Sequence, residues 1–383
     1  MRFLMRIMQV SGVMCDREGG GVGDYVCSLS SRLCEYGHDV EILTYSKEPS
    51  KHRDDPFIVN RIGSADLPVV RFLKWGRDAS IWISRTAEAE RFDIVHAHTT
   101  SMAFPMFYES RTPLIVTSHG TSRDPVHGPV GRLALMLIEK RYYREARRVI
   151  AVSQAIAREL VRRGISENRI EIIPNGSDSR RFHIDQDDRA IFRRSLGIDD
   201  NDFVVLFLGA LTKRKGLNVL MEAIRKILAG EQRRFFHFLI AGDGPLRTAV
   251  QRLAENFQSV HAFGFVGEAR LATIYSAADL FVIPSLYEGL PTTMLDAMTL
   301  GLPIIASDIS AHRETIGSDG GIFVTAGDSG PLADAILLAR ATRVSLAAMA
   351  QVARLRSKAY DWDQITPKIL ALYNSILASP GRD

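Results

Sequence analysis

Short apolar runs alternate with helix-like segments along almost the whole chain. The first half contains six runs whose length and composition predict buried strands: residues 7–10, 40–44, 94–96, 114–117, 149–152 and 170–173. The second half contains five more, each followed by a helix-like segment: residues 203–208, 236–241, 260–263, 280–283 and 303–306. Alternation of this kind predicts parallel sheets with helices on both faces, and the two series predict two such sheets.

A polar, acidic stretch at residues 185–194 and 197–202 separates the two series. A length of 383 residues also favours two domains over one. We therefore expect an α/β protein with two Rossmann-like, doubly wound parallel-sheet domains, at residues 1–180 and 181–358, and a last helical segment at 359–383. Ligands of open parallel sheets bind at the carboxyl ends of the strands, so two facing sheets would enclose a central cleft.

The segment from Glu288 to Asp296 places two carboxylates on either side of a predicted turn. It follows the strand at 280–283, and its middle, Gly-Leu-Pro-Thr-Thr, has a proline near the first position of a helix. Backbone N–H groups at a helix start have no partner within the helix and suit an anion such as a phosphate. The two carboxylates can accept hydrogen bonds from hydroxyls, which fits a sugar linked to a nucleotide diphosphate. An ordinary helix start with two solvated acids has the same pattern.

Composition narrows the class of protein without selecting a partner. The net charge of +4 permits an anionic partner such as a nucleotide, a phospholipid surface or a nucleic acid. The three cysteines lie at positions 15, 27 and 34, and no Cys/His cluster has metal-ligand spacing, so we expect neither a disulfide framework nor a zinc site. The N-terminus does not resemble a signal peptide, and no apolar stretch reaches about 18 residues. We therefore expect a cytoplasmic protein.

A glycine-rich run, from Gly19 to Gly23, lies between the first predicted strand and the first predicted helix. Glycines let a backbone approach a phosphate closely and leave N–H groups free to bind it. The run is not the dinucleotide-binding fingerprint, because the sixth position counted from Gly19 is Asp24. The chain has no P-loop motif either, which excludes the P-loop NTPases. A plain flexible turn would have the same glycines.

Two further loops bring basic side chains to predicted strand ends. His119 follows the strand at 114–117 and can donate to a phosphate or a sugar hydroxyl, although a histidine at a strand end is often structural. Three consecutive cations, Lys213, Arg214 and Lys215, follow Gly209 at the end of another strand. They form either a solvated basic turn or a clamp on the charge of a diphosphate.

A helix-like segment at residues 132–148 is rich in both apolar and basic residues. Such a helix can lie on an anionic membrane surface with its cations at the headgroups. An ordinary amphipathic helix with a buried face and a solvated basic face has the same pattern. A lipid-linked acceptor and a peripheral position at the inner face of the cell membrane are therefore open possibilities.

The order of these motifs resembles that of the retaining glycosyltransferases of GT-B fold. That large family includes phosphatidylinositol mannosyltransferases, sucrose synthases and bacterial polysaccharide glycosyltransferases. The motifs that carry the resemblance are Gly20-Gly21, His119, Ile173-Pro-Asn-Gly176, Gly209 to Gly216, Gly242-Asp-Gly-Pro245, Glu288 to Asp296 and Ala311-His-Arg-Glu314. It runs from Gly20 to a terminal helix between Trp362 and Tyr373, and it implies that this helix crosses back onto the first domain.

The resemblance also implies a role for each matching residue. Glu288 would bind hydroxyls of the donor sugar, Lys215 would neutralise the leaving diphosphate, and His119 would contact the sugar or stabilise the transition state. Asp296 would bind the ribose of the nucleotide. The remaining donor-binding positions contribute backbone groups or neighbouring side chains: Gly20, Gly21, Gly209, Lys213, Arg214, Val266, Leu290, Pro291, Thr292 and Thr293.

Two positions depart from the family's pattern. The second acid is usually glutamate, whereas here it is Asp296, which is one methylene shorter. An arginine usually follows the glycine at 209 and pairs with the lysine on the diphosphate, whereas here that position is Ala210. Lys213 or Arg214 would have to supply the missing charge, and lysine does not replace the bidentate grip of arginine on a phosphate.

The resemblance implies metal-independent transfer of a sugar from a nucleotide-diphosphate donor to a sugar or lipid-linked acceptor, with no nucleic-acid partner and no cofactor. Fixed cations and helix N-termini would stabilise the departing diphosphate. Two other functions remain open: a nonhydrolysing sugar-nucleotide epimerase, and a silent sugar-nucleotide-binding module suggested by Ala210 and Asp296. The sequence does not identify the sugar, the base, the acceptor or the oligomeric state.

Overall fold

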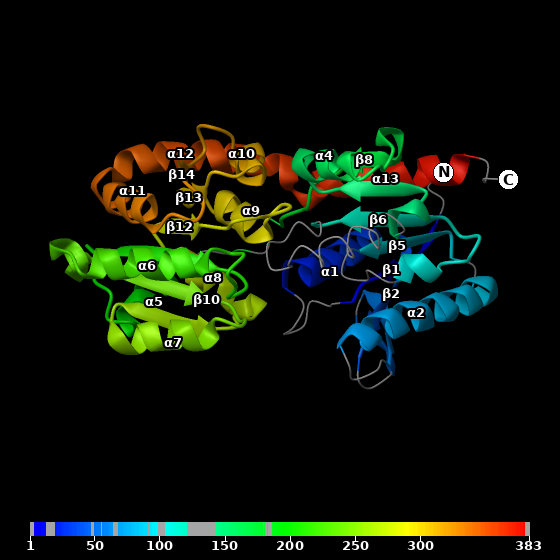
Figure 1. Cartoon of the computed structure of the whole chain (residues 1–383), viewed down its shortest axis with the longest axis horizontal. Helices are drawn as coiled ribbons and strands as arrows, with labels where there is room; N and C mark the ends of the chain where they lie inside the picture. The colour runs from blue at the N-terminus through cyan, green and yellow to red at the C-terminus, as the bar shows by residue number, and fades with distance from the viewer. Residues whose placement is uncertain are drawn as a thin grey trace. The chain divides into compact units, whose positions relative to one another are not determined.

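The computed structural model describes residues 4–12, 20–46, 50–54, 56–63, 68–90, 92–98, 104–120, 142–178, 180, 182 and 186–379. The chain forms two compact units (Figure 1). Unit 1 contains Met1–Gly176 and Trp362–Asp383, and unit 2 contains Ser177–Asp361. Unit 2 is thus continuous in the sequence, whereas unit 1 is assembled from both ends of the chain.

Unit 1 is built on an eight-stranded sheet. In sheet order the strands are β3 (Ser50–Asp54), β4 (Phe57–Ile62), β2 (Asp39–Tyr45), β1 (Arg6–Val10), β5 (Ile94–His98), β6 (Leu114–Ser118), β7 (Arg148–Ala151) and β8 (Ile170–Ile172). The edge strand β3 pairs antiparallel with β4, and the other neighbours pair in parallel. The central strands are buried along their whole length, as expected of a sheet covered on both faces.

The described helical segments of unit 1 are α1 (Gly20–Glu35), α2 (Pro68–Glu90), η2 (Phe104–Phe107), α4 (Gln154–Arg162), η3 (Glu167–Arg169) and α13 (Trp362–Ala378). Helix α1 buries Val26, Leu29 and Leu33 at helical spacing. It ends as predicted at a left-handed Gly37, and the N–H of His38 donates to the carbonyl of Leu33 at 3.1 Å.

Helix α13 completes the core of unit 1, although it lies more than 180 residues beyond the last strand of that sheet. Ile365, Ile369 and Tyr373 are fully buried and share one cluster with residues of α1, β1 and β2. A Cβ on Gly176 would lie 2.3 Å from the indole of Trp362, so the two chain crossings pack against each other at a position that only glycine allows.

Unit 2 is built on a six-stranded parallel sheet. Its order is β11 (Val260–Gly264), β10 (Phe236–Ala241), β9 (Phe203–Leu208), β12 (Leu280–Ile283), β13 (Ile304–Ser307) and β14 (Ile322–Val324). The order runs outward in opposite directions from β9 and β12, so these two strands form the topological switch point. In open parallel sheets, ligands bind at the carboxyl ends of the strands at such a point.

The helical segments of unit 2 are α5 (Gln186–Ser195), α6 (Leu217–Leu228), η5 (Glu231–Phe235), α7 (Arg247–Asn256), α8 (Glu268–Ala277), α9 (Thr292–Thr299), α10 (Ser310–Ile316), α11 (Ser329–Ala341), α12 (Arg343–Ser357) and η6 (Lys358–Tyr360). Figure 1 shows helices on both sides of the strands. The core combines sheet residues such as Val205 and Val282 with apolar residues of the helices, among them Leu220 and Ile336.

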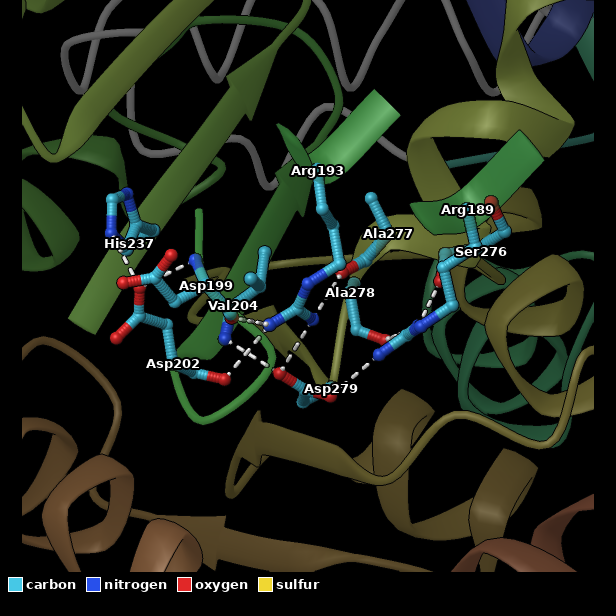
Figure 2. A network of polar contacts seen from close by, with 10 residues as sticks. All are labelled: Arg189, Arg193, Asp199, Asp202, Val204, His237, Ser276, Ala277, Ala278 and Asp279. Carbon is cyan, nitrogen blue, oxygen red and sulfur yellow. Dashed lines mark hydrogen bonds and ion pairs between the residues drawn. The ribbon is translucent and has the colours of Figure 1, made fainter. Parts of the chain in front are cut away.

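A buried polar network ties α5 to the amino end of β9 (Figure 2). Asp279 accepts hydrogen bonds from Arg189 at 2.8 Å, from Arg193 at 3.2 Å and from the N–H of Val204 at 2.8 Å. Arg193 also donates to the carbonyls of Ala277, Asp199 and Asp202. The Asp279 carboxylate therefore links α5, β9 and the end of α8. The network lies at the amino end of β9, away from the carboxyl ends of the strands.

The structure confirms the α/β class with two parallel-sheet units, and all eleven predicted strands occur with ends shifted by one or two residues at most. It also contains three strands that the hydrophobic pattern did not predict. The edge strand β3, with sequence SKHRD, is polar throughout, and β14 has only three residues. Strand β4 is apolar enough to be recognised, but it follows β3 directly in a hairpin instead of following a helix.

Two expectations about unit 1 change. Cys27 is disulfide-bonded, whereas the sequence led us to expect no disulfide framework. Of the amphipathic segment at 132–148, only residues 142–148 are described, and Tyr142 and Tyr143 are buried. The helix predicted over 132–148 ends at residue 144, because Arg148 already begins β7, and the rest of the segment, at 132–141, lies outside the described residues.

Candidate active site

The carboxyl ends of β9 and β12 bring two cations to one buried carboxylate. Glu288 lies in the loop after β12 and is 6% exposed. Its Oε1 accepts from the Nζ of Lys215 at 2.6 Å and from the hydroxyl of Ser285 at 2.7 Å, and its Oε2 accepts from Arg214 at 3.3 Å. Both cations come from the turn that follows β9, so the switch point of the sheet assembles the cluster.

The turn after β9 can approach β12 this closely because of Gly216. This residue is left-handed, with φ +70°, and a Cβ on it would lie 1.9 Å from the carbonyl oxygen of Pro284. The N–H of Leu286 donates to the carbonyl of Arg214 at 2.8 Å, which fixes the two loops together. Lys215 therefore reaches Glu288 from a backbone that is docked onto the strand end.

The charges around Glu288 keep it ionised. Burial acts to raise the pKa of its carboxyl, but the charges of Lys215 and Arg214, with hydrogen bonds from Lys215 and Ser285, outweigh burial and lower the pKa below its usual value. Removal of either partner of such an ion pair would leave the other charge buried and uncompensated, which is strongly destabilising. Glu288 thus holds Lys215 in place as a cation at the strand end.

Three further residues lie next to this ion pair: His312, which belongs to a motif quoted above but was given no role, and Ser285 and Ser307, which sequence reasoning missed. Ser307 ends β13 and Ser285 lies two residues beyond the end of the neighbouring β12, and the hydroxyl of Ser307 donates to the carbonyl of Ser285. The Nδ1 of His312 donates to the carbonyl of Ser307 at 2.8 Å. His312 is fully buried, and burial lowers its pKa despite the nearby charge of Glu288. Serines at or just beyond the ends of two adjacent parallel strands were the available signal.

Helix α9 begins immediately after Glu288 with an open N-terminus. Pro291 occupies the N-cap position and no side chain caps the helix. Leu290 and Pro291 are buried, whereas Thr292 and Thr293 are partly exposed. A helix start without a side-chain cap offers its first N–H groups to an anion, and the helix dipole adds to that attraction. The predicted anion site therefore starts directly beside the ion pair.

Asp296 lies one turn into α9 and is 7% exposed. Its Oδ1 accepts a hydrogen bond from the hydroxyl of Ser177 at 3.0 Å. Sequence reasoning did not identify Ser177, because 119 residues separate the two. The shorter acid that departs from the family's pattern is thus held by a hydroxyl from the start of unit 2.

The other predicted positions of unit 2 divide into backbone sites and one exposed cation. The carbonyl of Gly209 would lie 1.8 Å from a Cβ on Gly242, so the loops after β9 and β10 are in close contact. Val266 is buried just beyond β11. Lys213 is exposed, and of the two cations expected to replace the missing arginine, Arg214 is the one that contacts Glu288.

His119, Gly20 and Gly21 belong to unit 1. His119 directly follows β6, and its Nε2 lies 3.2 Å from the Nδ1 of His98, whose Nε2 lies 2.8 Å from the Oε1 of Gln9. Burial lowers the pKa of His119 to about 3, although a hydrogen bond with Asn175 opposes the shift. His119 is therefore neutral at physiological pH. Gly20 and Gly21 are exposed. They form the first turn of α1 itself, whereas we expected them in the loop that precedes the helix.

Two properties of the described residues concern metal binding and membrane insertion. No group of three or more His, Cys, Asp or Glu side chains there has the arrangement needed to hold a metal ion. No single described helix is long and apolar enough to cross a bilayer, and only one sharply bent pair, Ser329–Ala341 with Ser345–Tyr360, meets the length and composition together.

Family models match both halves of the chain. A model described as Glycosyltransferase Family 4 matches residues 19–181, and a model described as Glycosyl transferases group 1 matches residues 202–340. Among curated proteins, a D-inositol 3-phosphate glycosyltransferase of Gordonia bronchialis is 26% identical over an alignment that covers 94% of this chain and 85% of that protein.

Solved structures share the whole architecture. A sucrose-phosphate synthase from Thermosynechococcus elongatus has a TM-score of 0.83 at 22% identity, covering 98% of this chain and 100% of that one. HepE of Anabaena, solved in complex with UDP and glucose, has a TM-score of 0.80 at 20% identity, covering 97% of this chain and 100% of that one. Both likenesses concern the fold. With one family model lying largely in each unit, the chain belongs to the GT-B glycosyltransferases of family 4 and group 1.

Proposed function

We propose that this glycosyltransferase moves a hexosyl unit from a nucleotide-diphosphate sugar to an acceptor hydroxyl, with retention of the anomeric configuration and without a metal ion. The observation that carries the proposal is the buried carboxylate of Glu288 paired with the partly buried cations Lys215 and Arg214, beside the open start of α9. It combines fixed positive charge, free helix amides and a hydroxyl-binding carboxylate, which are the groups that a sugar diphosphate requires.

Lys215 is the group best placed to bind the diphosphate. An ammonium has three N–H donors, and one of them points to Glu288. The other two are available for phosphate oxygens, and the first amides of α9 supply further donors. A cation held rigidly in a partly buried place stabilises developing charge more than a mobile one in water does. These groups would take the role that Mg²⁺ has in other transfers of phosphate esters.

In the proposed reaction the bond between the anomeric carbon and the β-phosphate oxygen breaks as the acceptor oxygen bonds to the same face of the sugar. The acceptor's proton passes to the departing phosphate oxygen, so atoms and charge balance without a protein base. Both oxygens of Glu288 already accept hydrogen bonds, so this carboxylate suits sugar binding better than nucleophilic attack. Neutral His119 would contact the sugar by hydrogen bonding and not as a cation.

Donor identity is the first measurement. HepE was solved with UDP and glucose, so UDP-sugars lead a thermal-shift panel that also contains GDP- and ADP-sugars. A ligand at 100 times its Kd adds about 2.7 kcal/mol of stability, which makes the preferred donor visible. The matched control is Lys215→Ala, whose shift should be much smaller. Failure of every nucleotide sugar to shift the melting point would contradict the donor site.

Two further experiments test the stereochemistry of transfer and its independence of metal ions. Proton NMR of the first-formed glycoside gives its anomeric configuration, and we expect it to match the donor. Activity should be unchanged in excess EDTA. An inverted product, or activity lost with EDTA and restored by Mg²⁺ or Mn²⁺, would each remove one part of the proposal.

Incubation with donor alone distinguishes the two alternatives. A nonhydrolysing epimerase would interconvert nucleotide sugars without an acceptor, and a silent binding module would bind donor without transfer or slow donor hydrolysis. We expect slow hydrolysis and no interconversion, because the cluster binds charge and hydroxyls but places no acid and base pair around a single sugar carbon.

The acceptor is proposed to be a sugar or lipid-linked sugar of a polysaccharide or glycolipid pathway, used at the inner face of the cell membrane. The relative of Gordonia bronchialis is named for D-inositol 3-phosphate, and the basic segment at 132–148 suits an anionic surface. Flotation with anionic liposomes at low salt tests the membrane contact. Binding that is lost when the basic residues of 144–148 are replaced by glutamine would support it, and no binding would remove it.

A further inference from the structure

The carboxylate of Glu288 accepts from three side chains that differ in rigidity. Lys215 and Arg214 reach it at the ends of long side chains, which are 15% and 28% exposed. Ser285 reaches it with a short side chain that has no exposed surface, and its hydroxyl donates to Oε1 at 2.7 Å. Long cationic side chains have many rotamers to lose, whereas a serine has few. Ser285 is therefore the most rigid of the three donors.

The backbone that carries Ser285 is held at three successive residues. Its two neighbours, Pro284 and Leu286, both contact the turn after β9. The carbonyl of Ser285 itself accepts the hydroxyl of Ser307 from the end of β13. A buried hydroxyl on a backbone fixed in this way is a donor at a fixed position. It can therefore orient the group to which it donates.

The Oε1 of Glu288 is shared between the serine and the lysine. It accepts from Ser285 at 2.7 Å and from the ammonium of Lys215 at 2.6 Å. A carboxylate oxygen has two lone pairs, so the hydroxyl takes one and leaves the other for the ammonium. The last torsion of a glutamate is broad, and a carboxylate without a fixed donor can turn about it. The serine thus sets the plane of the carboxylate, and that plane determines where the ammonium lies.

We propose that Ser285 is a positioning residue for the leaving-group cation. Its hydroxyl fixes the carboxylate of Glu288, and the carboxylate fixes the ammonium of Lys215 where the diphosphate departs. The inference rests on the proposed function and adds to it a residue that contacts no substrate. Donors stabilise developing charge best when they are already in place before the reaction. The effect of the hydroxyl on the diphosphate should therefore depend on the presence of Lys215.

The test is a double-mutant cycle between Ser285 and Lys215, measured with ligands that lack the sugar. Titration calorimetry on the full chain gives the Kd of UDP and of UMP, and their ratio reports on the β-phosphate alone. The ADP and AMP pair and the GDP and GMP pair are run in parallel. We expect the wild-type protein to bind its preferred diphosphate at least about tenfold more tightly than the monophosphate, because hydrogen bonds from a cation to phosphate are strong.

The cycle predicts that the two substitutions are not independent. Ser285→Ala should weaken binding of the diphosphate by roughly fivefold to tenfold and binding of the monophosphate by less than about twofold. In the Lys215→Ala chain, the same serine substitution should weaken diphosphate binding by less than about twofold, since the cation that it positions is gone. In sugar transfer, Ser285→Ala should lower kcat by roughly tenfold.

Three controls keep the result specific. Ser357→Ala removes another buried hydroxyl of unit 2, one that donates to the carbonyl of Arg354, and it should change neither Kd. Ser285→Thr keeps the hydroxyl and should keep the wild-type ratio. Ser285→Ala leaves the contact with Ser307 in place, because that contact is made by the backbone carbonyl. Should the alanine variant still fail to fold, Ser285→Cys keeps the size with a weaker donor, and the same cycle applies to it.

The outcomes separate this inference from the proposed function. Equal weakening of diphosphate and monophosphate by Ser285→Ala would show that the serine is only structural and overturn the inference. An effect on the diphosphate that persists undiminished in the Lys215→Ala chain would also overturn it, while leaving the donor site intact. Absence of binding by every nucleotide, or a ratio unchanged by Lys215→Ala, would instead overturn the proposed diphosphate site, and this inference with it.

Discussion

Lys215 combines the two properties that a leaving-group cation needs, a fixed position and a partly buried environment. Its ammonium lies 2.6 Å from Glu288, and its side chain is 15% exposed. Loss of one well-placed donor to a developing oxyanion typically costs about 2.7–4 kcal/mol, so Lys215→Ala should lower kcat by roughly 10²–10³-fold. Steady-state kinetics with the preferred donor measures this.

The neighbouring exposed cation serves as the control for Lys215. Lys213→Ala removes the same charge two residues away and should change kcat by less than about threefold, because a solvated charge is screened. A purified, folded Lys215→Ala enzyme with near-normal kcat would show that the diphosphate is stabilised elsewhere.

Three histidines of unit 1 should make its stability depend on pH: His96 and His98 are buried in β5, and His119, just beyond β6, is partly buried. Burial lowers the pKa of His96 and His119 to about 3 and that of His98 well below its usual value. Unfolded histidine titrates near 6.5, so between these values the unfolded chain binds more protons. Stability should therefore fall as pH falls below about 6.5, by up to about 1.4 kcal/mol per pH unit for each histidine.

Tryptophan fluorescence measures this effect in unit 1 alone, because Trp75, Trp82 and Trp362 all lie in that unit. Urea unfolding followed in this way at pH 7, 6 and 5 gives the slope. His96→Asn removes one of the three histidines and should lower the slope of the free energy of unfolding against pH by the contribution of that one residue. This holds whether or not the substitution changes the stability at pH 7. Stability that stays constant from pH 7 to pH 5 would mean that these rings titrate normally in the folded protein.

At the scale of elements, the Asp279 network joins α5, α8 and β9 at the end of the sheet away from the candidate site (Figure 2). Arg193 is buried, pairs with Asp279 and donates to three carbonyls. Removing one partner of a buried ion pair typically costs about 3–5 kcal/mol, so Arg193→Ala should destabilise unit 2 by about that amount.

Arg194 provides the matched control for this network, since it is the next residue of α5 and is exposed. Arg194→Ala should change stability by less than about 0.5 kcal/mol. Calorimetric unfolding with bound nucleotide, which marks the transition of unit 2, measures both. Equal stability of the two variants would show that the network contributes little.

At the scale of the whole molecule, unit 2 is one continuous segment and unit 1 is not. A chain that ends at Asp361 lacks α13, which places Trp362, Ile365 and Tyr373, among others, in the core of unit 1. Each large side chain removed costs roughly 1.5–3 kcal/mol of burial, and their sum exceeds the usual stability of a domain. Unit 1 should therefore unfold while unit 2 keeps its nucleotide site.

Two readouts follow these units separately. In the truncated chain Trp75 and Trp82 should emit as in the unfolded protein, whereas UDP or the preferred nucleotide should bind with a Kd within about threefold of the full chain. Truncation after Ser379 leaves α13 complete and should change neither signal. If the tryptophans of the chain that ends at Asp361 emitted as buried side chains, unit 1 would fold without α13 and the prediction would be wrong.

The sequence by itself determined the α/β class, the division into two series, nearly all strands and the motifs at their ends, because periodicity and turn chemistry are written in contiguous residues. The glycine-rich start of α1, the cations after β9 and the acids around α9 could all be read in this way.

Only the tertiary structure decided which of these groups meet. Ser177 and Asp296 are 119 residues apart, and Lys215 and Glu288 are 73 apart. Arg214 rather than Lys213 contacts Glu288, His312 lies beneath the ion pair, and α13 fills the core of unit 1. Contacts of this range depend on how strands order themselves in a sheet, and no local pattern of hydrophobic and polar residues encodes that order.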